Sequence, residues 1–143
     1  MYLTRDPISP EDLLLLPEDF HSGAEVVFLG KVRDHSQGRK VLFLEYEAYE
    51  MMAEKLIGNY IREARERWQI DSLKVSHRLG KVMLGQIAVL IQVGSAHRDE
   101  AYQASRFLIE SIKHQVPIWK KEYFDDGTNE WSLCQHGNSI PVS

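Results

Sequence analysis

The chain has 143 residues, about the length of one domain, and its 43% hydrophobic and 27% charged residues are ordinary for a folded protein. Its formal net charge of −4 argues against a general nucleic-acid-binding protein, which normally carries a basic excess. The single cysteine, Cys134, cannot form an internal disulfide and belongs to no zinc-binding pattern, so we expect a reducing, cytoplasmic location. The apolar run near the N-terminus is only four leucines long, and we expect neither a signal peptide nor a membrane span.

The first third of the chain predicts two strands after an irregular lead-in. Residues 1–22 are punctuated by prolines, and their SPEDLL segment is able to open a short helix. Residues 23–33 form a Val- and Phe-rich run typical of a buried strand. Residues 34–40 are polar and contain a glycine, which predicts a loop. Residues 41–49 alternate between apolar and acidic side chains from Phe43 on, which predicts a half-buried strand.

The middle of the chain predicts a helix followed by two strands. Residues 50–68 place their apolar side chains on one stripe at helical spacing, with charged side chains opposite. Residues 72–80 predict a third strand, and Gly80 and Gly85 bracket a turn. The nearly continuous apolar run at residues 86–95 is typical of the central strand of a sheet.

The last third predicts a second helix and a hairpin. Residues 98–114 carry an apolar stripe and acidic residues in the first turn, and Val116–Pro117 ends this helix. The segments IWKKEYF and EWSL flank an Asp-Gly turn signal. The order β-β-α-β-β-α-β-β predicts an α+β sandwich with mainly antiparallel pairing. We expect one domain over residues 1–143, ending in a tail at residues 132–143.

Cationic residues gather at a few points of this acidic chain and suggest a site for an anion. His97 and Arg98 stand where the central strand meets a helix N-terminus, and backbone N–H groups and the helix dipole favour an anion there. The positive charge of Arg98 is electrostatically unfavourable at the N-terminus of a helix unless an anion is bound nearby. We therefore interpret His97 and Arg98 as a binding site for a phosphate or a carboxylate. The alternative is that Arg98 pairs with Asp99 or Glu100 and that His97 caps the helix.

Three other cationic groups admit a functional and a structural interpretation. Lys113, in the last turn of the second helix, either contributes to a site or complements the helix dipole. Lys120 and Lys121 either join that site or form a solvated strand edge. Lys31 and Arg33 share one sheet face and either bind an anion or form an exposed strand end.

The spacing along the second helix constrains how these groups meet. Arg98 and Lys113 are fifteen residues apart, which is about 22 Å along a straight helix. Groups that far apart cannot hold one small ligand together. Either they serve separate sites, or a second copy of the chain brings the start of its helix to the end of this one. The second option predicts a symmetric dimer with composite pockets.

Four segments resemble, in order and spacing, the large (catalytic) subunit of molybdopterin synthase. These segments are FLGKVRDHSQG, LEYEAYEMMAEK, GSAHRDEAYQASRFLIESIK and PIWKKE, and the resemblance covers roughly residues 23–131. The resemblance implies an α/β hammerhead-type sandwich with two main helices and an added antiparallel β subdomain.

The resemblance also implies a sulfurtransferase of molybdenum cofactor biosynthesis. Such a subunit converts cyclic pyranopterin monophosphate to molybdopterin by adding two sulfurs as a dithiolene. The sulfur would come from the C-terminal thiocarboxylate of a small ubiquitin-like subunit ending in Gly-Gly, and the large subunits would form a homodimer within a heterotetramer. The pterin is a substrate, so no cofactor, metal, nucleic acid or membrane is expected. The thiocarboxylate is the nucleophile, which makes Cys134 incidental.

The family's site residues carry over position by position. Those that match substrate-binding positions are Lys31, Val32, Arg33, His97, Arg98, Lys113, Lys120, Lys121 and Glu122. Lys113 and Lys120 match the key catalytic lysines. Some members have an arginine shortly after the tryptophan of the last hairpin, contributed across the dimer. No basic residue closely follows Trp131 in this chain, so no site residue is carried over from the tail.

Two other functions fit the same residues. A non-catalytic anion- or nucleotide-binding module would use Arg33 and Arg98 but would not need Lys113. An adaptor would dock a ubiquitin-like protein through exposed strand edges and would need none of these cations for chemistry.

Overall fold

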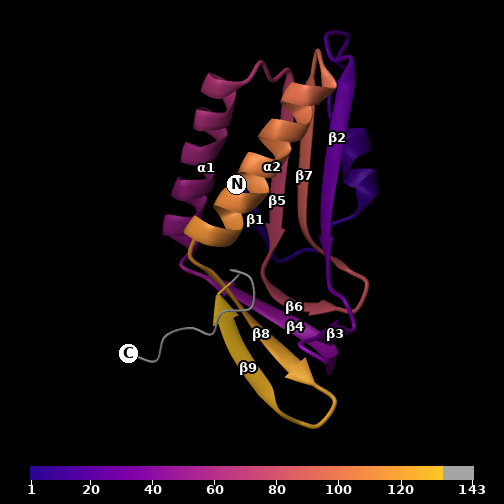
Figure 1. The fold of residues 1–143 in the computed structure, drawn as a ribbon, viewed down its shortest axis with the longest axis vertical. Coiled ribbons are helices and arrows are strands. Elements are labelled where there is room, and N and C mark those ends of the chain that lie inside the picture. Colours follow the sequence, from indigo (N-terminus) through magenta and orange to yellow (C-terminus); the bar gives the residue numbers. More distant parts are fainter. Residues whose placement is uncertain (134–143) are drawn as a thin grey trace.

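Two sheets and two long helices make up residues 1–133, the part of the chain that the computed structural model describes (Figure 1). The four-stranded sheet has the order β1-β5-β7-β2, formed by Leu3–Thr4, Ser72–Arg78, Ile87–Ser95 and Ala24–Lys31. The second sheet has the order β3-β4-β8-β9 with β6 also paired to β4, formed by His35–Ser36, Arg39–Ala48, Ile118–Phe124, Asn129–Leu133 and Gly80–Met83. Among these strands only β1 and β5 pair in parallel. The predicted α+β class with mainly antiparallel pairing is confirmed.

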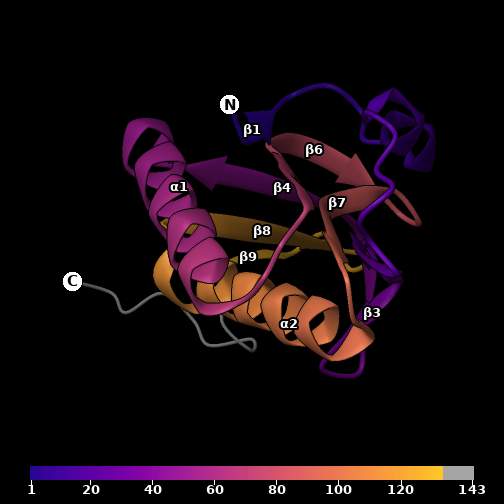
Figure 2. The same ribbon diagram turned by 90° about the horizontal axis from the view of Figure 1, so that it is seen from above.

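Both long helices cover the same face of the four-stranded sheet (Figure 2). They are α1 (Glu50–Arg67) and α2 (Arg98–Gln115), each within one residue of its predicted bounds. A short 3₁₀ helix, η1 (Pro10–Leu15), begins at Ser9, whose side-chain oxygen accepts a hydrogen bond from the backbone N–H of Glu11. No helix within residues 1–133 is long and apolar enough to cross a membrane.

Strand β7 is the centre of the four-stranded sheet, as its apolar run predicted. All nine of its residues are buried, because the helices cover one face and the N-terminal segment covers the other. On the second face, Ile8 and Leu13 pack against Ile87 and Leu90. A strand covered on both faces has no exposed position for polar residues, which explains the continuous run.

Helix α2 is fixed to this sheet by one stripe of side chains. Ala101, Ala104, Leu108 and Ile112 are 0–2% exposed and belong to the main core. The helix ends at the C-cap residue Val116, and β8 begins two residues later in the other sheet. The last turn of α2 therefore lies at the junction of the two sheets (Figure 1).

Three short strands differ from the sequence expectations. The lead-in at residues 1–22 contains β1, which the Glu54 carboxylate holds by accepting hydrogen bonds from the backbone N–H groups of Tyr2 (2.6 and 3.0 Å) and Leu3 (2.9 Å). The expected loop at residues 34–40 is a tight hairpin of β3 and β4. The expected strand at residues 72–80 is β5 alone, because Gly80, with φ of 86°, redirects the chain into β6 of the other sheet.

A histidine lies in the core of the four-stranded sheet. His77 on β5 is 4% exposed, and its ring contacts the ring of Tyr46 edge-on at a centroid distance of 5.1 Å. Burial lowers the pKa of His77 from 6.5 to about 4, with a further lowering by the positive charge of Lys113. A hydrogen bond to the backbone carbonyl of Arg78 acts in the opposite direction.

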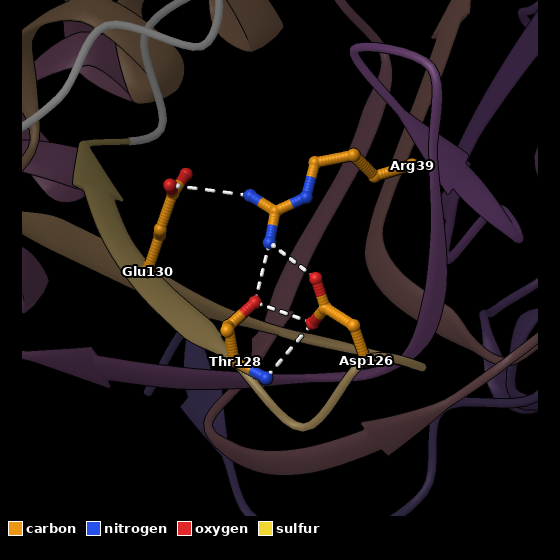
Figure 3. Close-up of polar contacts among 4 residues, drawn as sticks. All are labelled: Arg39, Asp126, Thr128 and Glu130. Atoms are coloured by element: carbon orange, nitrogen blue, oxygen red, sulfur yellow. Dashed lines mark hydrogen bonds and ion pairs between the residues drawn. The ribbon is translucent and has the colours of Figure 1, made fainter.

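The β8–β9 hairpin is clamped by one arginine from β4 (Figure 3). Arg39 forms ion pairs with Asp126 (3.4 Å) and Glu130 (3.2 Å) and donates a hydrogen bond to the Thr128 hydroxyl. Its guanidinium also lies 3.6 Å from the ring centroid of Phe124. The turn itself contains Gly127 with φ of 87°, as the Asp-Gly signal predicted.

We predict that acid destabilises the protein through His77. The folded state holds the imidazole neutral, whereas the unfolded chain binds a proton below pH 6.5. The stabilisation is therefore complete above about pH 6.5 and is lost as the pH falls to about 4. It amounts to about 3 kcal/mol over this window. Urea unfolding of the wild type and of His77→Leu at several pH values measures it. An equal pH dependence of the two proteins would contradict this assignment.

We predict that Arg39→Ala loosens the β8–β9 hairpin. The loss is about 1 kcal/mol, mainly from the contact with Phe124, since exposed ion pairs contribute little. Hydrogen exchange of the β8–β9 amides and urea unfolding measure the effect. Lys55→Ala, which removes a cation from the exposed face of α1, is the matched control. The clamp has no such role if both variants exchange their hairpin amides at the wild-type rate.

Candidate functional site

A cavity of about 530 Å³ lies where the end of α2 meets both sheets. Its volume falls within the range of small-molecule binding sites, about 300–1,000 Å³. The side chains that give it chemical character are Lys31, Arg33, His35, Tyr46, His77, Lys113, Lys120 and Glu122. Four of these carry a fixed positive charge and one is a carboxylate, so the cavity favours an anion.

The end of β2 and the segment that follows it supply two of the cations. Lys31 and Arg33 line the cavity, whereas Val32 between them is 3% exposed and packs in the core. The backbone of Val32 is held on both sides, because its N–H donates to the carbonyl of Gln86 (3.0 Å) and its carbonyl accepts from Gly85 (2.8 Å). Both side chains line one cavity, although Arg33 lies two residues beyond the end of β2 and belongs to no strand. Val32 is placed to position these two side chains through its backbone.

Helix α2 supplies the third cation from its last turn. Lys113 follows the buried Ile112, and Ile109, one turn earlier, also lines the cavity. The partial negative charge at a helix C-terminus favours a lysine there. The structural interpretation of Lys113 is therefore compatible with the functional one, which stays a prediction.

Strand β8 supplies the fourth cation and the carboxylate. Lys120 and Glu122 lie on the same face of the strand, and Glu122 is only 8% exposed. The interpretation of this segment as a solvated strand edge is wrong, because β8 pairs with β4 on one side and β9 on the other. Lys121 lies on the opposite face, with its Nζ 5.3 Å from the ring centroids of both Tyr123 and Trp131.

The two residues at the start of α2 lie away from this cavity. His97 and Arg98 are exposed at the opposite end of an 18-residue helix from Lys113. His97 is the N-cap residue of α2, as the alternative interpretation expects, but its side chain makes no capping hydrogen bond. Within residues 1–133 no ion pair joins Arg98 to Asp99 or Glu100. A single chain thus brings together Lys31, Arg33, Lys113, Lys120 and Glu122 and leaves His97, Arg98 and Lys121 outside.

Sequence reasoning missed two aromatic rings of the cavity. Tyr46 on β4 and His77 on β5 are both buried and both line it. Residue alternation carried a signal for the histidine, because Leu73 and Val75 precede it on the same face of the strand. A polar residue at the next position of an apolar strand face indicates either a buried hydrogen-bond network or a functional site.

The arrangement suits the binding and chemistry of anions. The Arg33 guanidinium is able to bind phosphate or carboxylate oxygens with two parallel hydrogen bonds. Ammonium groups on two separate elements, Lys113 and Lys120, are able to stabilise negative charge that develops between them. Residues 1–133 contain no group of His, Cys, Asp and Glu side chains arranged to hold a metal ion. Cys134 and the tail that follows it lie outside the described residues.

The sequence matches the family model "MoaE protein" over residues 3–115. Curated relatives are molybdopterin synthase catalytic subunits. The protein from Nostoc sp. is 40% identical over 130 residues, 90% of this chain and 79% of the relative. The protein from Staphylococcus aureus (strain COL) is 43% identical over 136 residues, 95% of this chain and 91% of the relative.

The fold agrees with a solved structure of the same family. The crystal structure of molybdopterin synthase from Staphylococcus aureus superposes with a TM-score of 0.84 at 41% sequence identity, covering 92% of this chain and 95% of that one. On this evidence the chain belongs to the MoaE family, the catalytic subunits of molybdopterin synthase.

Proposed function

We propose that this chain is the catalytic subunit of a molybdopterin synthase and that its cavity is the site of sulfur transfer to cyclic pyranopterin monophosphate. The observation that carries the proposal is the convergence of Lys31, Arg33, Lys113 and Lys120 on one cavity from three separate elements. The family assignment supplies the reaction, and the cavity supplies charge of the sign that a phosphorylated substrate requires.

The cyclic phosphate of the substrate is assigned to the two cations at and just after the end of β2, Lys31 and Arg33. Arg33 provides a planar fork for two phosphate oxygens, and Lys31 adds a second positive charge on the same side. The apolar part of the lining, which includes Leu44 and Ile109, offers a surface for the flat pterin rings. A polar head and an apolar body are thus both accommodated.

The chemical step is assigned to the two lysines. Attack by the thiocarboxylate sulfur on the pterin forms a C–S bond, expels oxygen and opens the cyclic phosphate, and the expulsion and the opening both build negative charge. Water then cleaves the bond between this sulfur and the partner's acyl carbon, which leaves the sulfur on the pterin and releases the partner's tail as a carboxylate. Lys113 and Lys120 would stabilise that charge, and an ammonium group is also able to donate a proton to the departing oxygen. Because the nucleophile arrives on the partner protein, the chain needs neither a cysteine nor a resident cofactor or metal.

The sulfur donor is proposed to be a small ubiquitin-like protein whose Gly-Gly tail ends in the thiocarboxylate. This tail is an anion, and the same excess of cations that binds phosphate attracts it. We place the reaction in the cytoplasm, in keeping with the single cysteine of the chain.

A second copy of the chain is proposed to complete the site. Strand β2 is the last strand of its sheet, so its outer edge carries no strand within residues 1–133. A second cavity of about 680 Å³ runs between β2 and α2 and shares Ile109 and Lys113 with the first. Two apolar side chains along it are exposed, Tyr102 (63%) and Val27 (39%). A two-fold contact here would run the two α2 helices in opposite directions, which brings His97 and Arg98 of one copy to Lys113 of the other.

We predict that Lys113→Ala lowers turnover by about 100-fold or more while binding of the partner protein is retained. The expected loss is that of one preorganised group at a centre of developing charge. Product formation with thiocarboxylated partner measures turnover, and calorimetry measures partner binding. Lys55→Ala is the control for loss of one surface cation and keeps wild-type turnover.

The same experiment separates the competing functions. Unchanged turnover in Lys113→Ala would remove the catalytic assignment of Lys113 and leave the binding module and the adaptor as the alternatives. Absence of any turnover in the wild type, with the pterin still bound, would favour the non-catalytic binding module.

We predict that mixing two inactive variants restores activity. In a dimer of Arg98→Ala with Lys113→Ala, one pocket carries both defects and the other carries neither. Random mixing makes half of the dimers mixed, so about a quarter of wild-type activity is expected. The assay is turnover after the two variants are unfolded and refolded together. Each variant refolded alone is the control, and no recovery in the mixture would show that each pocket draws its residues from one chain.

A further inference from the structure

A pocket of about 360 Å³ lies between the four-stranded sheet and the N-terminal segment, on the face of the sheet opposite the two long helices. The sheet contributes Glu25 from β2, Ser72 from β5 and Gln92 from β7. The N-terminal segment contributes Glu18 and Asp19. We call it the acidic pocket. It shares no lining residue with the cavity of the proposed reaction.

The charged groups of the acidic pocket all have the same sign. The carboxylates of Glu18, Asp19 and Glu25 line it, and no lysine, arginine or histidine of residues 1–133 does. Hydrogen bonds from the Ser22 hydroxyl and from the backbone N–H of His21 hold the pKa of Asp19 below its ordinary value of 3.8. This carboxylate is therefore ionised at neutral pH, and the pocket favours a cation that enters from outside.

Three oxygen atoms gather over Gly94, which has no side chain to fill the space. The position that a Cβ on Gly94 would take lies 2.8 Å from Ser22 Oγ and 3.4 Å from Asp19 Oδ2, and Ser72 Oγ is nearer still. The Ser22 hydroxyl also lies 3.3 Å from Oδ2 of Asp71. A side chain at position 94 would collide with these oxygens, so the glycine allows them to stay close together.

A buried amide in the acidic pocket has an acceptor without a partner. Gln92 is 1% exposed and lines the pocket. Its Nε2 donates a hydrogen bond to Ser72 Oγ (2.9 Å), which orients the amide. Its Oε1 is buried and has no hydrogen-bond partner within residues 1–133. An unpaired buried acceptor costs free energy, and a donor bound in the pocket would remove this cost.

We propose that the acidic pocket binds an alkylammonium or alkylguanidinium group, which donates hydrogen bonds to the Asp19 carboxylate and to Oε1 of Gln92. Such a group carries only donors and a positive charge, whereas these two side chains offer acceptors and a negative charge. Leu13, Leu16 and Pro17 line the same pocket and are able to pack against the alkyl chain.

A bare metal ion fits the acidic pocket less well than an organic cation. Residues 1–133 contain no group of three or more His, Cys, Asp and Glu side chains that could hold a metal ion. The apolar part of the lining also has no use for an ion without an alkyl chain. The inference does not depend on the proposed function, because neither the pocket nor its ligand takes part in the proposed reaction.

The site is tested on the free full-length chain by NMR, with n-butylammonium as the probe. The side-chain NH₂ signals of Gln92 and the backbone amide signal of Gly94 are expected to shift and to saturate, with a Kd of about 1 mM, as so small a ligand allows. Ca²⁺ is expected to leave these signals in place. Signals that do not respond to n-butylammonium, or that respond more strongly to Ca²⁺, would overturn the proposal.

Two substitutions test the proposed contacts. Asp19→Asn keeps the Oδ1 that accepts a hydrogen bond from the backbone N–H of His21 but removes the charge, and Gln92→Met removes the buried acceptor. Each is expected to raise the Kd about tenfold, the loss of one hydrogen bond to a charged group. Glu66→Gln, which removes one charge from the exposed face of α1, is the control and keeps the wild-type Kd. A wild-type Kd in Asp19→Asn or in Gln92→Met would refute the assigned contacts.

Two further probes identify the source of the cation. Leu14, Leu15 and Phe20 are 81–87% exposed and are sequence neighbours of lining residues, so they are available to apolar side chains of a protein partner. Tighter binding of the peptide acetyl-Leu-Lys-Leu-amide, weakened by Phe20→Ser, would assign a protein side chain. Tighter binding of spermidine would assign a free polyamine. Both results uphold the site, whereas failure of both probes to displace n-butylammonium would count against it.

Discussion

Four cations around one cavity repel one another, and the packing of the rest of the structure has to offset this electrostatic repulsion. Two unit charges about 4 Å apart repel by about 1 kcal/mol in water and about 4 kcal/mol near a protein surface. Side chains on flexible segments would separate to relieve this repulsion. Here the cations lie at and just after the end of β2, at the end of α2 and in the middle of β8, and the core holds each of these segments. The repulsion among the cations is present in the free protein, and a bound anion reduces it. This reduction favours binding.

The packing that positions the cationic side chains is centred on strand β7. Because both faces of this strand are covered, its position relative to the helices has little freedom, and the stripe of α2 that ends in Ile112 is set against it. The short connection from Val116 to β8 then ties the end of α2 to the second sheet. Lys113 and Lys120, seven residues apart in the chain, thus reach one cavity from a helix and a strand that lie in different layers.

The apolar part of the lining and the buried polar groups act together with the charges. Side chains such as Ile109 and Leu44 exclude water, which strengthens each interaction between a cation and a bound anion. The buried rings of Tyr46 and His77 add shape without adding charge as long as the imidazole stays neutral. The same burial that protects the site therefore links the stability of the protein to pH.

Periodicity and turn signals predicted the two helices, the central strand and the hairpin turn at Gly127, and motif resemblance identified the lysines and the arginine that line the cavity. These features depend on residues that are close together in the chain. The sequence did not predict β1, β3 and β6, because a strand of two to four residues is too short to show a period and forms only by pairing with distant segments. Long-range packing was needed to establish that Lys120 faces the cavity while Lys121 faces away, that β8 is an inner strand, and that His77 and Lys113 line the same cavity. Strand register and sheet order decide which face of each element points to the cavity. Both depend on segments that are distant in the chain, so they cannot be predicted from neighbouring residues.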